Sequence, residues 1–446
     1  MNAALSRSFD SLQVPNYRRF FLGQVVSISG NWMQTVAEVW LILSLTGSGF
    51  AVGVTTALQF LPILLAGAWG GALADRFNKR SLLILTQTAM MLPPLILFTV
   101  TLSGTVQPWM VFALVFVRGS LIAIDNPARQ AFVMEMVGPD RIVNAVSLNS
   151  VIVHSSRVAG PAIAGILIAT VGVAACFGLN ALTFLVMIWA LWSMDGQGLT
   201  SPPRSGRDQR GVMEAVRYVR ATPELRVPLL LMAVVGTLGL NFHVVLPLLA
   251  SITFEGGPTS YAVLVSAMGV GSVIGALVTG ARGYTGIGVI AFSSLAFGGM
   301  AMAAAFMPSL ATELPVLALL GAAAVTFAAA INSTLQLVVS PEMRGRVMAL
   351  YTVVFLGSTP IGGPLVGWIS EAYDPRYALA MAAFSGLLAA ACAFWVRART
   401  AVAGVRPDLK ISSDNGFHGL ACAQSASHRS RILDRRSRGT GSGAVA

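Results

Sequence analysis

Residues 50–102 place two apolar runs on either side of a short charged turn: FAVGVTTALQFLPILLAGAWGGALADRFNKRSLLILTQTAMMLPPLILFTVTL. The runs at 50–73 and 81–102 each supply the about 20 apolar residues that a helix needs to cross the hydrocarbon core of a bilayer. The turn between them holds four charged residues, Asp75, Arg76, Lys79 and Arg80. This arrangement predicts a pair of antiparallel helices that cross a membrane.

The whole chain has the composition of a membrane protein. Of its 446 residues, 55% are hydrophobic and 11% are charged, whereas soluble domains contain about 25% charged residues. The mean hydropathy is +0.74. These values exclude a disordered protein, a disulfide-rich secreted module and an ordinary cytosolic enzyme. The three cysteines are widely separated and show no metal-ligand spacing. We expect no metal, no cofactor and no enzymatic activity.

Further apolar runs of similar length bring the predicted spans to twelve. The first six lie at 20–45, 50–73, 81–102, 108–130, 145–170 and 174–193. The second six lie at 227–250, 259–281, 286–307, 314–338, 347–370 and 377–396. These spans must be helices because lipid offers no hydrogen-bond partner to an exposed backbone group. We therefore predict an all-α polytopic membrane protein with two six-helix bundles.

Lys and Arg residues are distributed unevenly between alternate loops. Of the 29, we assign 26 to one membrane face, which includes both terminal segments, and Arg376 alone to the other. The remaining two, Arg118 and Arg157, lie inside predicted spans. Because cytoplasmic loops are enriched in these residues, both termini and the 194–226 linker are predicted to be cytoplasmic. The net charge of +11 then reflects topology and contacts with anionic lipid, and we expect no nucleic-acid partner.

The two halves of the chain repeat one another weakly at an interval of about 203 residues. The matches are Gly71-Ala72-Leu73 with Gly275-Ala276-Leu277, Pro139-Asp140 with Pro341-Glu342, and Gly160-Pro161 with Gly363-Pro364. Parallel repeats are typical of transporters in which two bundles rock about a central site; chance similarity among Gly- and Ala-rich helices is the alternative. The expected organisation is a cytoplasmic N-terminus at 1–19, bundles at 20–193 and 227–396, a linker with a short amphipathic helix at 194–226, and a disordered basic cytoplasmic tail at 397–446.

The turn at 71–80 resembles the signature loop of the major facilitator superfamily, G-x-x-x-D-R-x-G-R-R/K. The matching residues include Gly71, Asp75, Arg76 and Arg80, and Asn78 replaces the usual Gly. The resemblance implies that Asp75 holds the two bundles together at a cytoplasmic gate; the alternative is a plain charged turn. Asp125 and Arg129 are expected to join this gate as a structural charge cluster.

Other stretches are similar to the twelve-helix drug-exporter branch of this superfamily, which includes enterobactin-exporter-like and macrolide-efflux-like proteins. They lie at 16–21, 125–130, 144–150 and 344–347, and the resemblance covers residues 12–396. Gly160, Pro161 and Gly165 resemble the span 5 antiporter motif G-P-x-x-G-G, with Ala164 in place of one Gly. A bend at this motif implies export, and simple helix packing is the alternative.

Four residues inside the predicted spans are candidates for proton coupling, because a charge at the centre of a membrane costs about 2.5–3.5 kcal/mol on insertion scales. They are Glu38, Arg118, Arg157 and His243. Glu38 is the preferred proton site; the alternative is a carboxylate that is only hydrogen-bonded to polar neighbours. Spans 1, 4, 7 and 10 line the central cavity of the resembled fold, which implies three substrate-cavity candidates, Asn241, Asn332 and Gln336.

The sequence contains no G-x-x-x-x-G-K-S/T loop, so an ion gradient rather than ATP is expected to drive transport. We predict a secondary active transporter of the cytoplasmic membrane that acts as a monomer. It would export a small amphiphile, such as a drug or a siderophore, in exchange for protons. One alternative is an importer of a polar nutrient, and another is a lipid mover or a membrane scaffold without transport.

Overall fold

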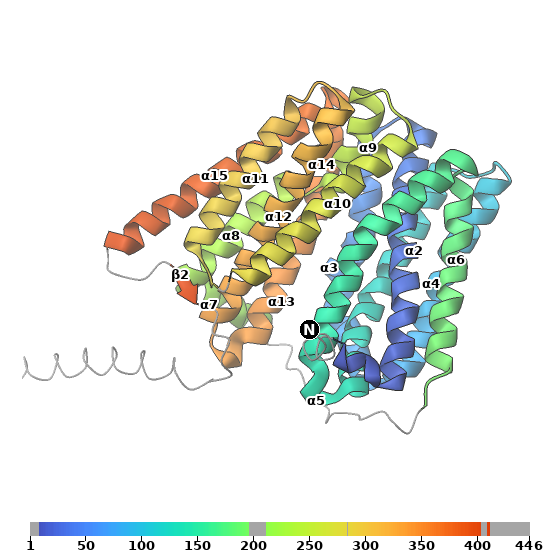
Figure 1. The fold of residues 1–446 in the computed structure, drawn as a ribbon, viewed down its shortest axis with the longest axis horizontal. Coiled ribbons are helices and arrows are strands. Elements are labelled where there is room, and N and C mark those ends of the chain that lie inside the picture. Colours follow the sequence, from blue (N-terminus) through green and yellow to red (C-terminus); the bar gives the residue numbers. More distant parts are fainter. Residues whose placement is uncertain (1–8, 196–210, 283, 403–407, 411–446) are drawn as a thin grey trace, which may run out of the picture. The chain divides into compact units, whose positions relative to one another are not determined.

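The computed structural model of the chain consists almost entirely of helices (Figure 1). The structure describes residues 9–195, 211–282, 284–402 and 408–410, without the side chains at 68–72, 74, 75, 143, 211, 212, 341 and from 400 onward. Residues 196–210 of the predicted linker and 411–446 of the predicted tail lie outside this description. All helices belong to one compact unit, Met1–Leu409.

The N-terminal half contains one short 3-10 helix and five long helices. They are η1 (Asp10–Gln13), α2 (Pro15–Thr46), α3 (Gly49–Arg76), α4 (Lys79–Leu102), α5 (Pro108–Thr170) and α6 (Val173–Trp192). The helix starts follow the local sequence. Ser48 and Asn78 accept hydrogen bonds from backbone N–H groups at the beginning of α3 and α4, and Pro15 and Pro108 begin α2 and α5.

The C-terminal half begins with a short helix and continues with a longer series. Its helices are α7 (Gly211–Ala221), α8 (Pro223–Leu238), α9 (Phe242–Leu248), η3 (Leu249–Thr253), α10 (Pro258–Ala281), α11 (Ile287–Ala305), α12 (Leu310–Val338), α13 (Pro341–Gly357), α14 (Thr359–Ala372) and α15 (Pro375–Val402). The described residues also include two three-residue strands, β1 (Tyr284–Gly286) and β2 (Asp408–Lys410).

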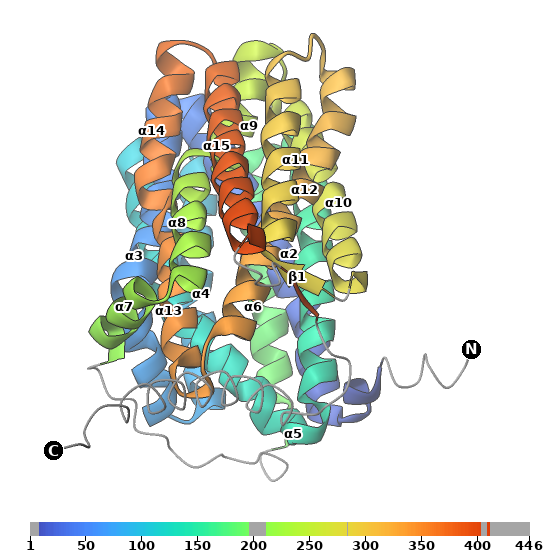
Figure 2. The ribbon, with the colours of Figure 1, turned by 90° about the vertical axis from the view of Figure 1, so that its left-hand side faces the viewer.

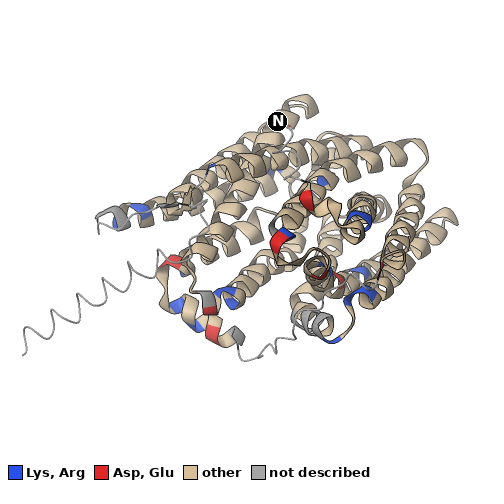
Figure 3. Cartoon of the chain, turned by 60° about the horizontal axis from the view of Figure 1, so that its bottom comes forward, with Lys and Arg blue, Asp and Glu red and all other residues tan. Residues whose placement is uncertain are grey.

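Eleven stretches of the described chain are long and apolar enough to cross a membrane, and they overlap predicted spans 2 to 12. Predicted span 1 lies in α2, whose 32 residues extend over about 48 Å. α2 contains Arg18, Arg19 and Glu38 within this length. Elsewhere charged residues are sparse along the helices (Figure 3). The prediction of an all-α polytopic fold is therefore confirmed.

Two predicted spans are interrupted rather than continuous helices. Span 7 consists of α8, α9 and the π-helical turn η3, and span 11 consists of α13 and α14, which meet at Ser358. At the break between α8 and α9, Asn241 Nδ2 donates hydrogen bonds to the carbonyl oxygens of Gly236 at 3.3 Å and Thr237 at 2.7 Å. The amide therefore satisfies backbone groups that the break leaves without a helical partner.

Predicted spans 4 and 5 are joined through a helical corner inside α5. Gly138 alone departs from helical dihedral angles within this element, with φ 71° and ψ 177°. Glycine tolerates a positive φ, and the residue before a proline is disfavoured in the α region. The Gly138-Pro139 pair therefore separates a first segment, 108–137, from a second segment, 139–170.

The helices form two bundles, α2–α6 and α8–α15 (Figure 1). In the N-terminal bundle α2 packs on α5 and α6, and in the C-terminal bundle α11 packs on α12 and α15. The linker helix α7 lies against α8 and α13 (Figure 2). The bundles contact each other mainly through α3 with α14 and through α5 with α10.

The contact between α3 and α14 is close because glycines face one another across it. A Cβ atom at Gly49 would lie 2.6 Å from the Gly367 carbonyl oxygen, and one at Gly53 would lie 2.7 Å from Pro364 Cα. Only small residues allow two backbones to approach this closely. We call the end of the bundles where α3 begins and α14 ends the capped end, and the end where α6 ends and α8 begins the linker end.

Gly53→Ala is expected to destabilise the protein because the added methyl group meets the backbone of α14. Overpacking of this kind costs roughly 1–3 kcal/mol. Gly67→Ala in the same helix is the matched control, since a Cβ atom there meets no atom within 4 Å and alanine is favoured over glycine in a helix by about 1 kcal/mol. Thermal unfolding in detergent measures both variants, and equal melting temperatures would contradict the close contact.

Candidate functional site

A buried ion pair joins α2 to the first segment of α5. Arg118 Nη2 lies 2.5 Å from Glu38 Oε2, and the two side chains are only 1% and 2% exposed. An isolated buried charge carries a penalty of several kcal/mol, so each group depends on the other for neutralisation. The structure thus brings together two of the four predicted proton-coupling candidates.

A chain of hydrogen bonds extends from this pair to α6. Gln34 Nε2 donates to Glu38 Oε1 at 2.6 Å, and Gln34 Oε1 accepts a hydrogen bond from Asn180 Nδ2. Asn180 Oδ1 accepts in turn from Thr183 Oγ1 at 2.8 Å. Each carboxylate oxygen of Glu38 therefore has its own donor, and the orientation of Gln34 is fixed from both sides.

The other two coupling candidates, Arg157 and His243, lie against one aromatic ring. The Arg157 guanidinium carbon lies 5.2 Å from the centre of the Trp32 ring. The His243 ring is stacked on Trp32, with 5.6 Å between centroids and 29° between planes. Trp32 and Arg157 come from α2 and α5, whereas His243 comes from α9, so this cluster bridges the two bundles. All three side chains are partly exposed.

The substrate-cavity candidates occupy two different places in the C-terminal bundle. Asn241 is buried at the break in span 7, where its Nδ2 atom is engaged with backbone and its Oδ1 atom has no hydrogen-bond partner among the described residues. Asn332 and Gln336 lie in the last turns of α12, where Gln336 Nε2 donates to Asn332 Oδ1 at 2.5 Å. Gln336 is exposed and Asn332 is half-buried.

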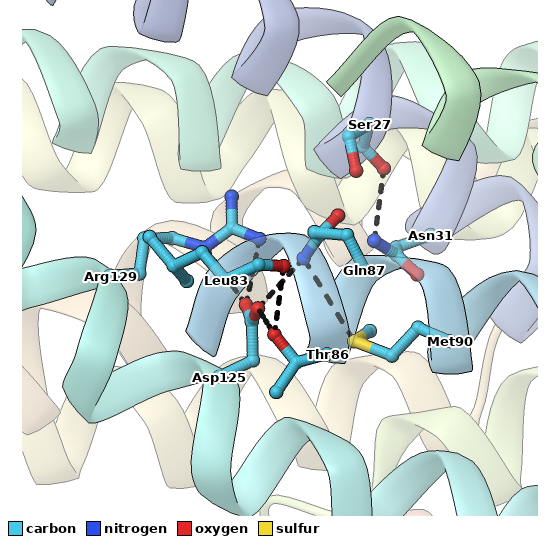
Figure 4. A network of polar contacts seen from close by, with 8 residues as sticks. All are labelled: Ser27, Asn31, Leu83, Thr86, Gln87, Met90, Asp125 and Arg129. Atoms are coloured by element: carbon cyan, nitrogen blue, oxygen red, sulfur yellow. Dashed lines mark hydrogen bonds and ion pairs between the residues drawn. The ribbon is translucent and has the colours of Figure 1, made fainter. Parts of the chain in front are cut away.

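Two members of the predicted charge cluster, Asp125 and Arg129, meet in the first segment of α5 (Figure 4). Asp125 Oδ1 accepts from Thr86 Oγ1 at 2.7 Å and Gln87 Nε2 at 2.8 Å. Asp125 Oδ2 accepts from Arg129 Nη2 at 2.7 Å and Nε at 3.0 Å. This buried carboxylate therefore fixes α4 against α5.

The expected partners of this cluster in the 71–80 turn are placed only in part. The side chain of Asp75 and the surroundings of Gly71 lie outside the described residues, and Arg76 is exposed. Arg80 donates from Nε to the Leu191 carbonyl at 2.9 Å and from Nη2 to the Trp192 carbonyl at 2.8 Å. It thereby satisfies carbonyl groups at the end of α6, where a positive charge is favoured. The role of this turn as a gate stays a prediction.

The Gly160-Pro161 motif lies in a continuous helical part of α5 and packs against both bundles. A Cβ atom at Gly160 would lie 2.9 Å from the Met33 nitrogen of α2, and Gly165 faces Ala262 of α10. Gly165 thus belongs to the contact between bundles, and Gly160 to the packing of α5 on α2. These contacts support the packing interpretation of the motif and leave a functional bend untested.

One contact between the bundles is absent from the sequence predictions. Glu371 Oε2, at the end of α14, accepts hydrogen bonds from Ser48 Oγ at 2.7 Å and from the Phe50 backbone N–H at 2.9 Å. The carboxylate thus binds the N-terminus of α3, where negative charge is favoured. The sequence offers a Gly47-Ser48 helix start after span 1 and an acid just after span 11, but neither signal identifies the partner of the other.

Two helical bundles, with eleven stretches of the described chain long and apolar enough to cross a membrane, define a polytopic membrane protein. Residues 6–424 match the family described as "Transmembrane secretion effector", and the chain belongs to this family. The family consists of transporters of the major facilitator superfamily, not enzymes. The predicted superfamily and exporter branch are confirmed.

Three curated relatives are each 26% identical to this chain. The staphyloferrin A transporter of Staphylococcus aureus matches over 58% of this chain and 65% of its own length, so the match spans just under two thirds of that relative. The multidrug efflux pump Tap of Mycolicibacterium fortuitum matches over 77% of this chain and 86% of its own length. The enterobactin exporter EntS of Salmonella choleraesuis matches over 83% and 89%.

Solved structures share the fold at low sequence identity. A bacterial homologue of the human lysosomal transporter Spinster, in an inward-facing and unoccupied conformation, has a TM-score of 0.67 at 17% identity and covers 88% of this chain and 98% of its own. The nucleoside transporter NupG has a TM-score of 0.69 at 12% identity, with coverages of 86% and 99%. These likenesses establish the architecture and carry no information on substrate.

Arg118→Gln is expected to destabilise the protein by about 3–5 kcal/mol because it leaves the buried Glu38 carboxylate without its counter-charge. The double variant Glu38→Gln/Arg118→Gln should recover part of this loss, since no buried charge remains.

The Arg346–Glu214 pair is the control: its atoms also lie 2.5 Å apart, but the side chains are 38% and 56% exposed. Arg346→Gln should therefore cost about 0–1 kcal/mol. Unfolding in detergent measures all three, and equal losses for Arg118→Gln and Arg346→Gln would refute the coupling.

Proposed function

We propose that this protein is a secondary active transporter that exports a small amphiphilic compound across the cytoplasmic membrane in exchange for protons. The observation that carries the proposal is the buried Glu38–Arg118 pair, an ionisable carboxylate inside a membrane-spanning bundle. Three relatives named as siderophore or drug transporters support a compound of that kind as the substrate.

The ion pair is suited to proton coupling because protonation of Glu38 determines whether the pair is stable. When Glu38 is ionised, it attracts Arg118 and keeps α2 and α5 together through a 2.5 Å contact. A proton on Glu38 removes this attraction and leaves Arg118 as an uncompensated charge in a place where charge is costly. Protonation therefore favours a rearrangement that gives Arg118 water or another partner, and such a rearrangement can accompany the exchange of bundle contacts.

A proton gradient supplies enough free energy for useful export. One elementary charge that crosses a potential of 100 mV releases about 2.3 kcal/mol. Because 1.36 kcal/mol corresponds to a factor of ten, this energy sustains a roughly 50-fold concentration ratio of substrate. A single proton per cycle is therefore sufficient.

The contacts between the bundles support an inward-facing state. The Glu371 contacts with Ser48 and Phe50 and the glycine contacts of α3 with α14 all lie toward the capped end. We propose that both termini and the linker are cytoplasmic, as the asymmetry of Lys and Arg predicts. The capped end is then the outer end, and the closed contacts there block the path to the outside.

Glu38→Gln is expected to abolish proton coupling because it removes the ionisable group. In inside-out vesicles with an imposed pH gradient, transported compounds from a panel of drugs and siderophores should dissipate the gradient in the wild type and leave it intact in Glu38→Gln. Exchange of labelled for unlabelled substrate needs no net proton movement and should be retained, which shows that the variant is folded. Glu342→Gln, at an exposed position of α13, is the matched control.

A gradient response that is unchanged in Glu38→Gln would remove Glu38 as the coupling site. The same assay separates the alternative functions: a polar nutrient importer responds to sugars or amino acids rather than to amphiphiles. A scaffold without transport leaves the gradient intact with every compound.

The proposed orientation predicts the activity of reporters fused to the chain. Green fluorescent protein at the C-terminus should fluoresce, and alkaline phosphatase at the same site should be inactive, because that enzyme folds only outside the cytoplasm. Alkaline phosphatase after Gly47, at the capped end, should be active. Activity at the C-terminus together with inactivity after Gly47 would reverse the orientation, and reporters that place the two termini on opposite faces would contradict the twelve-span topology.

A further inference from the structure

In the cluster of Trp32, Arg157 and His243, the Arg157 guanidinium has no acidic partner among the residues that the structure describes. Arg157 forms no hydrogen bond or ion pair with any described residue, and its Nε atom is buried without a partner. The ionisable groups within electrostatic reach of Arg157 are His154 and His243, neither of which is acidic. Glu38 is already engaged by Arg118. The site therefore carries net positive charge within the spans.

An uncompensated guanidinium inside a membrane-spanning bundle is costly, and the ring of Trp32 offsets only part of that cost. Arg157 lies in the middle of the second segment of α5, where Gly160 packs against α2 and the Arg157 carbonyl lies 3.1 Å from where a Gly269 Cβ atom would be. The side chain thus belongs to the region between α2, α5 and α10, and it is partly exposed there. Its free donors are available to a ligand that enters between the bundles.

The chemistry of the three side chains defines what such a ligand would be. A guanidinium presents a planar set of N–H donors that matches a carboxylate, often through two parallel hydrogen bonds. Trp32 and His243 supply flat rings beside it, and flat rings stack on aromatic bodies. Because His243 belongs to the C-terminal bundle and Trp32 and Arg157 to the N-terminal bundle, one ligand can touch both halves.

We propose that Trp32, Arg157 and His243 form the recognition site for an organic carboxylate with an aromatic or planar apolar body. This inference rests on the proposed function, since it names the substrate class of the exporter. Arg157 binds the carboxylate, and the planar body packs beside the rings of Trp32 and His243, so that the ligand contacts both bundles. The carboxylate completes the charge balance that the protein leaves open.

The test is equilibrium binding of a matched pair of probes, 2-naphthoate and its methyl ester, to purified protein in phosphatidylcholine nanodiscs. The wild type should bind the carboxylate about 10-fold or more tightly than the ester, which is the effect of one charge-assisted hydrogen bond. Arg157→Gln should lose this preference while it retains affinity for the ester, and Arg157→Lys should retain part of it. Trp32→Leu should weaken both probes equally.

Arg282→Gln is the control, because Arg282 is exposed beyond the end of α10 and outside the cluster. It should leave both affinities unchanged. Equal binding of the two probes to the wild type, or a preference that survives Arg157→Gln, would overturn the proposal. The ester affinity retained in Arg157→Gln shows that the variant is folded.

An anionic lipid headgroup could supply the same charge, and a second nanodisc distinguishes the two sources. Replacing part of the phosphatidylcholine with phosphatidylglycerol should leave the naphthoate affinity unchanged if the site takes a soluble carboxylate. A strong competitive loss would assign the site to a headgroup and overturn the proposal as stated.

Binding in nanodiscs and transport in vesicles can fail independently. If the probes show no carboxylate preference but amphiphiles still dissipate the pH gradient, the proposed recognition site is wrong and the proposed export function is retained. If the carboxylate is preferred through Arg157 but nothing is transported, the exporter is wrong and the site stands.

Discussion

The cost of an unpaired charge in hydrocarbon is the constraint on which the interior of this protein depends. The chain keeps few charges within its spans, and several of those that remain are paired. Glu38 and Arg118 neutralise each other at 2.5 Å, and Gln34 occupies the second carboxylate oxygen. Asp125 is held in the same way by Arg129, Thr86 and Gln87. Arg157 differs because it has no ion-pair partner among the described residues. We therefore interpret it as a residue that binds a ligand.

Close backbone contact is the second constraint, because it determines where the bundles can separate. Gly49 and Gly53 allow α3 to lie directly on α14, and Glu371 then reaches the start of α3. Contacts of this type are strong when they are closed and are lost together when the helices part. In the proposed transport cycle, opening of the capped end would separate all of these contacts.

The sequence was sufficient for the architecture because apolar length is a direct signal. Twelve runs of about 20 residues specify twelve spans, and Lys and Arg in the loops predict an orientation. The interruptions could not be read in this way. The Asn241 amide donates to the backbone where span 7 breaks, and its role as a substrate-cavity residue stays a prediction. The corner at Gly138 depends on a glycine that precedes a proline.

Only part of the candidate site could be predicted from the sequence, for a physical reason. Glu38, Arg118, Arg157 and His243 stand out because charge in a span is rare, but the pairing of Glu38 with Arg118 depends on the rotation of α2 against α5. Trp32 gave no signal, since an aromatic residue in an apolar run is ordinary. Its importance arises only when the other bundle brings His243 against it.

The two halves of the repeat have diverged in charge. The 71–80 turn of the first half retains an acid and three bases, whereas the corresponding stretch around Arg282 has no acid. Of the four coupling candidates, only His243 belongs to the second half. Trp32 and Glu38 are six residues apart on α2, which is about 9 Å along the helix. The proposed ligand beside Trp32 and the proposed proton on Glu38 would therefore act on the same helix, α2.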